Sequence, residues 1–377
     1  MNKKRLTYLI ASLTVLFCIG ATTKISYADG ANFSVTPIAA SHQTDKNLGY
    51  FNLLLNPGES EKLNFQIVNS SSSTIKINTT FGTAFTTSTG NVGYTPNLVK
   101  PDASMKINLK DYVKLPKTLT LPAHASAEVT ATVTMPTKNF TGVIAGGFNF
   151  EENTSDTTAP SSKKTGVTIT NNYRYVIGLV MQESMTKVAP SLNLGSVKAD
   201  QVNERNVISA QLTNPAMAYL MQMNTIAEVT SLKDKSIKYD FSNSAMEMAP
   251  NSNFNLAIPV SIQGVLNGKT SQPLKPGKYH LHMIVYGNKD NSGQYQTLVN
   301  GQVTKYDYKW TFDKDFTITG NQATTLNAKD PTINHKTTIN WLLIIGIVII
   351  ILFLFIIILL LFKRRNKEED DKKEQEN

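Results

Sequence analysis

Short alternating runs of apolar and polar residues fill the chain between about residues 29 and 340. In the run LNFQIV, for example, Leu63, Phe65 and Ile67 would share one face of an extended strand, because side chains alternate along a strand. Similar runs, rich in Val, Ile, Thr, Tyr and Phe, are separated by Gly, Pro, Asn and Ser. No convincing amphipathic helix interrupts them. The pattern predicts antiparallel β-sandwiches.

The strand pattern starts again after about residue 188, which predicts a second domain. The phrases LNPGESEKLNFQIV and LKPGKYHLHMIV parallel each other, each with a Pro-Gly turn before a strand. We therefore predict an all-β protein with two tandem immunoglobulin-like β-sandwich domains, at residues 29–182 and 183–320. The polar segment 151–166 fits either a linker or a long hairpin within the first domain. The sequence leaves open whether the two domains are rigidly docked.

The N-terminus has the pattern of a signal peptide. Basic residues at 3–5 precede an apolar run at 9–19, and Ser26-Tyr27-Ala28 fits a small-x-small cleavage site. The apolar run is short for a retained anchor, which needs about 20 residues. We therefore predict that residues 1–28 are a cleaved signal peptide.

A second apolar run, at 341–362, is long enough to cross a membrane. At about 1.5 Å per residue it spans roughly 33 Å, against about 30 Å for a hydrocarbon core. The basic cluster at 363–365 then places the tail, residues 363–377, in the cytoplasm and the two domains outside. We predict a single-pass protein of the cell membrane, with residues 321–340 forming a polar stalk.

Cysteine content and charge narrow the setting further. The only cysteine, Cys18, lies in the predicted signal peptide, so the mature chain has no disulfide and depends on its hydrophobic cores, as suits a bacterial surface. Of the net charge of +9, the signal peptide carries +4 and the tail is balanced, which leaves +5 for the exterior. This mild excess does not argue for nucleic acid, so we predict no nucleic-acid partner, and it suits anionic wall polymers.

Residues that could perform chemistry are few. His280 and His282 would share one face of a strand, but no third ligand follows from the sequence, so an exposed strand face is favoured over a metal site. Glu59 and Glu61 follow a turn, where solvated charges are common. No nucleophile elbow, zinc-protease helix or phosphate-binding loop is present. We predict no enzymatic activity, no cofactor and no metal.

Two adjacent glycines, Gly146 and Gly147, lie inside a strand pattern in VIAGGFNF. Glycine inside a strand often marks a bulge or a place where another part of the backbone approaches closely. We favour either of these over a ligand cradle.

The order of the motifs resembles the WxL-interacting proteins of Gram-positive bacteria. FSVTPI, GYFNLLLNPGESEKLNFQIVN, PDASMKINL and MPTKNFTGVIAGGFNF are similar to that family's peptidoglycan-binding domain. NNYRYVIGLVMQES, QLTNPAMAYLMQMNTIAEV and YKWTFDKDFTI are similar to its host-binding domain. The resemblance implies a membrane-tethered partner of WxL-domain surface proteins, with one domain for peptidoglycan and one for host extracellular proteins. No contact residues are carried over from the family.

Candidate binding residues come instead from the chemistry of the side chains. Aromatic rings stack on sugars and are enriched in protein interfaces, and methionine-rich surfaces adapt to protein partners. The candidates for glycan contact are Tyr50, Tyr94, Tyr173 and Tyr175, and those for protein contact are Tyr219 and Met221. Ordinary packing inside a sandwich is the alternative for each of them.

These observations favour a non-enzymatic, membrane-anchored binding and scaffold protein of the cell surface. The main alternative is a membrane-bound chaperone or assembly factor for WxL surface proteins, which would complete partner strands at open sheet edges. A wall hydrolase is a third hypothesis, disfavoured because no paired acids in a cleft are recognisable from the sequence.

Overall fold

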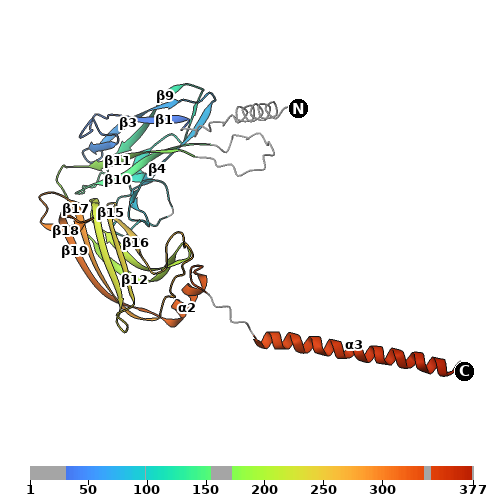
Figure 1. Cartoon of the computed structure of the whole chain (residues 1–377). Coiled ribbons are helices and arrows are strands. Elements are labelled where there is room, and N and C mark those ends of the chain that lie inside the picture. The colour runs from blue at the N-terminus through green and yellow to red at the C-terminus, as the bar shows by residue number, and fades with distance from the viewer. Residues whose placement is uncertain (1–30, 98, 154–171, 335–340, 376–377) are drawn as a thin grey trace, which may run out of the picture.

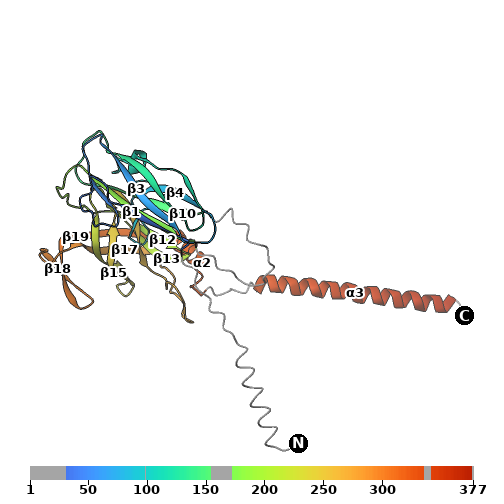
Figure 2. The same cartoon turned by 90° about the horizontal axis from the view of Figure 1, so that it is seen from above.

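The computed structural model describes residues 31–97, 99–153, 172–334 and 341–375. Two β domains lie one above the other, and a long C-terminal helix extends away from them (Figures 1 and 2). The predicted signal peptide and residues 154–166 of the predicted linker or hairpin lie outside the described residues.

The first domain is built from two sheets around one hydrophobic core. The four-stranded sheet contains, in spatial order, β1 (Phe33–Ile38), β3 (Ser60–Asn69), β9 (Ser126–Thr134) and β7 (Val113–Lys114). The five-stranded sheet contains β2 (Phe51–Leu54), β11 (Arg174–Gln182), β10 (Ile144–Glu152), β4 (Ile75–Thr83) and β8 (Thr118–Leu121). A short hairpin, β5 (Phe85–Thr86) and β6 (Val92–Gly93), and a 3-10 turn, η1 (Leu109–Tyr112), lie beside them.

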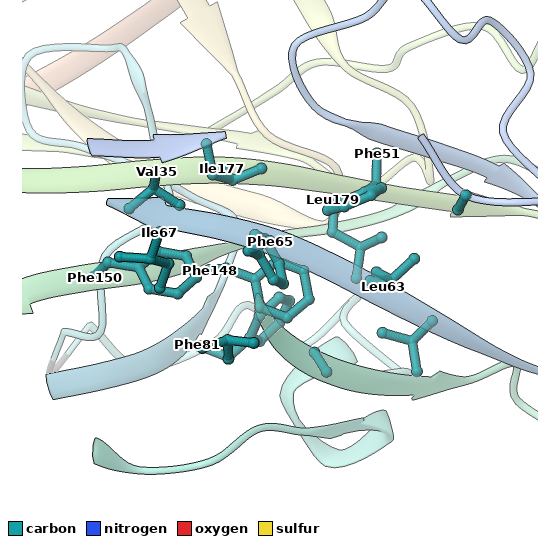
Figure 3. Packing of buried hydrophobic residues seen from close by; sticks show 14 of the residues in the cluster. Val35, Phe51, Leu63, Phe65, Ile67, Phe81, Phe148, Phe150, Ile177 and Leu179 are labelled. Carbon is teal, nitrogen blue, oxygen red and sulfur yellow. The ribbon is translucent and has the colours of Figure 1, made fainter. Parts of the chain in front are cut away.

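The centre of the first core is a cluster of phenylalanines around Phe65 (Figure 3). Phe65 meets Phe51 and Phe148 edge to face, with ring centroids 5.4 and 4.9 Å apart. Such pairs add about 0.5–1.5 kcal/mol beyond the burial of their area. Leu63 and Ile67 are buried with Phe65, so the predicted face of β3 is confirmed.

The second domain also has two sheets around its own core. The three-stranded sheet contains β12 (Asn193–Val202), β13 (Arg205–Asn214) and β16 (Ser252–Pro259). The five-stranded sheet contains β15 (Lys238–Met248), β14 (Leu220–Ser231), β17 (Gly277–Lys289), β19 (Gln302–Ile318) and β18 (Tyr295–Val299). Neighbouring strands in both sheets are antiparallel. The predicted all-β class is confirmed, whereas the immunoglobulin-like topology stays a prediction.

The segment that follows β19 differs from the prediction. Residues 320–329 form a helix, α2 (Gly320–Lys329), which packs on the second domain. The side chain of Asn327 donates to the carbonyl of Leu274 and accepts from its N–H, both at 2.9 Å. Asp330 is fully buried. The predicted polar stalk is therefore wrong for residues 321–334, because these polar side chains find buried hydrogen-bond partners that composition does not reveal.

The C-terminal helix, α3 (Trp341–Gln375), contains the predicted membrane span. Its most apolar window, Ile344–Leu361, has a mean hydropathy of 3.8 and is not buried by the rest of the protein. Both views show it projecting away from the two domains (Figures 1 and 2). By length and composition, this helix is able to cross a membrane.

Candidate functional site at the domain junction

The hairpin β5–β6 of the first domain docks on the second domain. The hydroxyls of Thr86 and Ser252 lie 2.6 Å apart in a buried position, and Thr86 also accepts from the N–H of Ala249 at 3.1 Å. The backbone of Glu247 donates to the carbonyl of Gly90 at 2.7 Å. The hairpin therefore bonds to the second domain through both side chains and backbone.

Two further contacts join the domains beside the hairpin. The N–H of Val143 donates to the carbonyl of Met217 at 2.7 Å. A Cβ atom on the preceding residue, Gly142, would lie 2.2 Å from that carbonyl oxygen, and Gly142 has a φ of +102°. Only glycine fits both constraints. Asn253 donates to a carboxylate oxygen of Asp102 at 2.6 Å.

Three of the predicted binding residues converge at this junction. The hydroxyls of Tyr94, in the first domain, and Tyr219, in the second, lie 3.2 Å apart. Burial raises the pKa of Tyr94 and raises that of Tyr219 well above its ordinary value, and the nearby Tyr50 adds to both shifts. Around the pair lies a small apolar cluster that includes Ala145 and Ala249. At neutral pH these hydroxyls are uncharged hydrogen-bonding groups.

Tyr94 reaches the junction because its backbone crosses the outer face of the five-stranded sheet. A Cβ on Gly82 would lie 2.4 Å from the carbonyl oxygen of Tyr94, and one on Gly147 would lie 2.6 Å from the Cβ of Tyr94. The side chain of Asn149 donates to the same carbonyl at 3.0 Å. A close approach at Gly147 is therefore found, but the approaching atoms belong to the side chain of Tyr94, and the backbone of Tyr94 lies against Gly82 instead.

The other predicted binding residues lie in different settings. Tyr173 and Met221 have 40% of their surface exposed, and Tyr50 has 39%. Tyr175 instead packs edge to face on Phe33 of the first core, with ring centroids 5.1 Å apart. The structure thus gathers Tyr50, Tyr94 and Tyr219 at the junction and places Tyr175 against a core.

A pocket of about 210 Å³ opens at the junction, beside the hairpin. Both domains line it, the first through residues 81–85 and nine residues between Pro96 and Lys110, and the second through residues 251–253. Its polar lining residues are Thr83, Asn97, Lys100, Asp102, Asn108, Lys110, Asn251, Ser252 and Asn253. The sequence analysis missed this pocket because its polar residues lie about 150 positions apart in the chain and carry no recognisable motif.

The two histidines singled out from the sequence lie on an exposed sheet face. His280 and His282 contact Asp315 and Asp313 on the neighbouring strand, through their Nδ1 atoms, at 2.6 and 2.7 Å. Their side chains are 38% and 47% exposed, as predicted for an exposed strand face. Within the described residues, no group of three or more potential ligands is arranged to hold a metal ion.

The paired glutamates differ in exposure from the prediction. Glu61 is only 7% exposed, and it accepts from the N–H of Ser41 at 2.8 Å. His42 lies between the two carboxylates, 2.6 Å from Glu61 and 3.0 Å from Glu59. The prediction of solvated turn charges is therefore wrong for Glu61, because its carboxylate fastens the loop before β2 to β3.

Comparison with known families covers both domains. Residues 33–152 match the family description "WxL Interacting Protein, peptidoglycan binding domain", and residues 164–328 match "WxL Interacting Protein, host binding domain". The chain belongs to the WxL-interacting protein family. The resemblance in the sequence motifs is confirmed, and both matched domains are binding domains.

Solved structures share only a distant likeness. Those similar to parts of the chain include a PapD-like domain of human CEP192, at 11% identity and a TM-score of 0.26, which covers 44% of this chain and 98% of that one. The class 5 fimbriae chaperone CfaA has 14% identity and a TM-score of 0.26, and the match covers 74% of this chain and 100% of CfaA. The E. coli chaperone DraB has 12% identity and a TM-score of 0.24, and the match covers 76% of this chain and 98% of DraB. No curated protein matches the chain. Likeness at this level says nothing about what the chain binds.

Proposed function

We propose that this WxL-interacting protein is a non-enzymatic scaffold that holds peptidoglycan with its first domain and tethers it to the membrane. Its second domain connects the wall to host extracellular proteins, and WxL-domain surface proteins are the partners that give the family its name. The match of two binding domains to two consecutive docked β domains, followed by an apolar helix, carries the proposal.

The arrangement of the second domain suits a spacer between wall and membrane. The start of β13 lies beside α2, where the N–H of Asn206 donates to Asp330 at 2.9 Å. The end of β13, at Asn214, lies at the junction, where its side chain donates to the carbonyl of Ala249, the residue whose N–H donates to Thr86 of the first domain. Ten residues of strand extend about 33 Å. If the basic cluster after α3 lies in the cytoplasm, the end of the second domain beside α2 faces the membrane. The second domain then holds the first domain about 33 Å beyond that end.

Exposure selects among the candidate contact residues. We propose Tyr50 and Tyr173 as glycan contacts and Met221 as a protein contact, because each presents about two fifths of its surface to solvent. Tyr94 and Tyr219 bond to each other across the junction, and Tyr175 packs on the first core.

The test is a pull-down with the full chain in detergent micelles. Purified peptidoglycan and a purified WxL-domain protein are presented separately, at low and moderate salt. We expect retention by both at moderate salt, with no soluble wall fragments released. Failure to bind either would contradict the scaffold, and released fragments would indicate a hydrolase. A WxL partner that binds before assembly but is missing from the mature surface complex would indicate the chaperone alternative.

A further inference from the structure

The junction pocket combines two lysines, several fixed amide groups and apolar walls. The apolar part comes from Phe81, Phe85, Pro96, Pro101 and Met105. A pocket of about 210 Å³ is smaller than a drug-sized site of 300–1,000 Å³, so it suits a small part of a larger ligand.

The amide side chains of the pocket are held in place by the protein. The side-chain oxygen of Asn108 accepts from the hydroxyl of Thr83, while Asn253 donates to Asp102. Asn251 donates to the carbonyl of Pro215 at 2.7 Å. Within the described part of the chain, Nδ2 of Asn108 and Oδ1 of Asn253 have no hydrogen-bond partner. A donor and an acceptor are thus pre-positioned for a ligand, which reduces the entropy lost on binding.

The charges of the pocket favour an anion. Lys100 and Lys110 are exposed at its rim, and among the described residues neither Nζ forms an ion pair or a hydrogen bond. Asp102 is the single carboxylate that lines the pocket. Burial opposes its ionisation, yet hydrogen bonds from Ser104 and Asn253 lower its pKa. The carboxylate of Asp102 therefore already has hydrogen-bond partners, whereas the ammonium groups of Lys100 and Lys110 are free to bind the carboxylate of a ligand.

We infer that this pocket binds the carboxylate-bearing peptide stem of peptidoglycan, and that both domains contribute to it. A peptide stem offers amide N–H and C=O groups, small apolar side chains and a terminal carboxylate, which match the fixed amides, the apolar walls and the two lysines. The inference rests on the proposed binding of peptidoglycan and adds which part is recognised. It also gives the second domain, through Asn253, a share in wall binding that the family description assigns to the first.

The experiment measures the affinity of the full chain for two soluble probes. One is a muropeptide mixture with intact stems, and the other is glycan from which the peptides have been removed by an amidase. We expect Lys100→Ala and Lys110→Ala each to weaken muropeptide binding about fivefold to tenfold, because each removes a charge-assisted contact. Binding of the peptide-free glycan should not change.

Matched variants separate the pocket from general charge and from folding. Lys114→Ala removes an exposed lysine on β7, and Asn255→Ala removes an exposed amide two residues from Asn253, and both should bind as the wild type does. Asn253→Ala should weaken muropeptide binding by a similar factor. A fold check by thermal unfolding accompanies it, because Asn253 also contacts Asp102.

Each contrary outcome points to a different failure. If the wild-type chain does not bind insoluble peptidoglycan at all, the proposed function fails. If it binds and the two lysine variants bind muropeptides equally well, the pocket inference alone is overturned. Equal losses for the peptide-free glycan would overturn the assignment to the peptide stem. Normal binding by a folded Asn253→Ala chain would overturn the contribution of the second domain.

Discussion

His42 is a residue whose charge changes near neutral pH and whose contacts depend on that charge. Its hydrogen bond to Glu61 raises its pKa above 6.5, with Glu59 adding to the shift. The pKa of Glu59 is lowered, first by the N–H of Asn56. Burial opposes ionisation of Glu61, but bonds from His42 and Ser41 outweigh it and lower that pKa too. The positive charge of His42 thus stabilises both carboxylates, which repel each other.

The sign of the pH effect follows from these directions. A raised histidine pKa contributes stability that is complete below 6.5 and is lost as pH rises through the folded-state pKa. The lowered glutamate pKa values contribute stability above 4.5, which is lost as pH falls. We therefore expect His42→Gln to destabilise the protein most between pH 4.5 and 6.5, and much less by about pH 8. Urea unfolding midpoints of both chains across this range measure the difference.

His124 provides the control for that titration. It is exposed on a turn with a φ of +56°, a conformation that asparagine also adopts. Because this side chain is exposed, His124→Asn should shift the unfolding midpoint only slightly. A constant difference between the wild type and His42→Gln would show that His42 acts by packing and not by charge.

At the scale of elements, two paired glycines on neighbouring strands differ in whether they leave room for a side chain. Gly147 on β10 pairs with Gly178 on β11. A Cβ on Gly147 would meet the Cβ of Tyr94 at 2.6 Å, whereas one on Gly178 would meet the Cβ of Tyr50 at an ordinary 3.5 Å. We expect Gly147→Ala to lower the free energy of unfolding by about 1–3 kcal/mol, because the crossing segment must move.

Gly178→Ala is the matched variant for this test. It should leave the free energy of unfolding unchanged or raise it by up to about 1 kcal/mol, since glycine in a strand is entropically unfavourable. Denaturant unfolding of the three chains decides between the two positions. Equal destabilisation by both substitutions would mean that alanine is poorly tolerated anywhere in these strands, and that the crossing of Tyr94 is not the cause.

The same elements show what the sequence could and could not predict. Alternation in β3 predicted its buried face, because alternation is a local property of a strand. Gly147 in β10 indicated a close approach but not its nature, since the approaching atom is the Cβ of Tyr94 and not backbone. The docking of β5–β6 and the packing of α2 depend on partners far away in the chain, such as Ala249, 163 positions from Thr86, and Leu274, 53 positions from Asn327. Periodicity reports which face of a strand is buried but not what covers it.

The candidate site shows the same division. Aromatic chemistry selected Tyr50, Tyr94 and Tyr219, which do lie together, but the sequence placed Tyr94 and Tyr219 in separate domains with separate ligands. Whether two sandwiches are docked depends on a few specific hydrogen bonds, which composition does not encode. The pocket that arises from the docking was invisible for the same reason.

For the whole molecule, the decisive question is whether the two domains behave as one body. Thr86 holds the junction with one hydroxyl, which bonds to Ser252 at 2.6 Å and accepts from Ala249 at 3.1 Å. Thr86→Val keeps the shape but leaves a buried N–H without its acceptor, at a cost of about 1–3 kcal/mol. Each 1.4 kcal/mol, roughly, changes the opening equilibrium tenfold. Amides of the junction, such as those of Glu247 and Ala249, should therefore exchange with deuterium roughly 5 to 150 times faster.

Peptide-resolved hydrogen–deuterium exchange on the full chain distinguishes opening of the junction from general instability. Core peptides around Phe65 and Leu281, which are fully buried in separate domains, should keep their protection. Thr118→Val, on the exposed side of edge strand β8, should leave the junction unchanged. Unaltered junction exchange in Thr86→Val would mean that the domains already separate freely. Equal loss of exchange protection in both cores would mean that Thr86 supports the whole fold. Faster exchange confined to the junction would show a docked pair whose shared pocket exists only while the domains stay together.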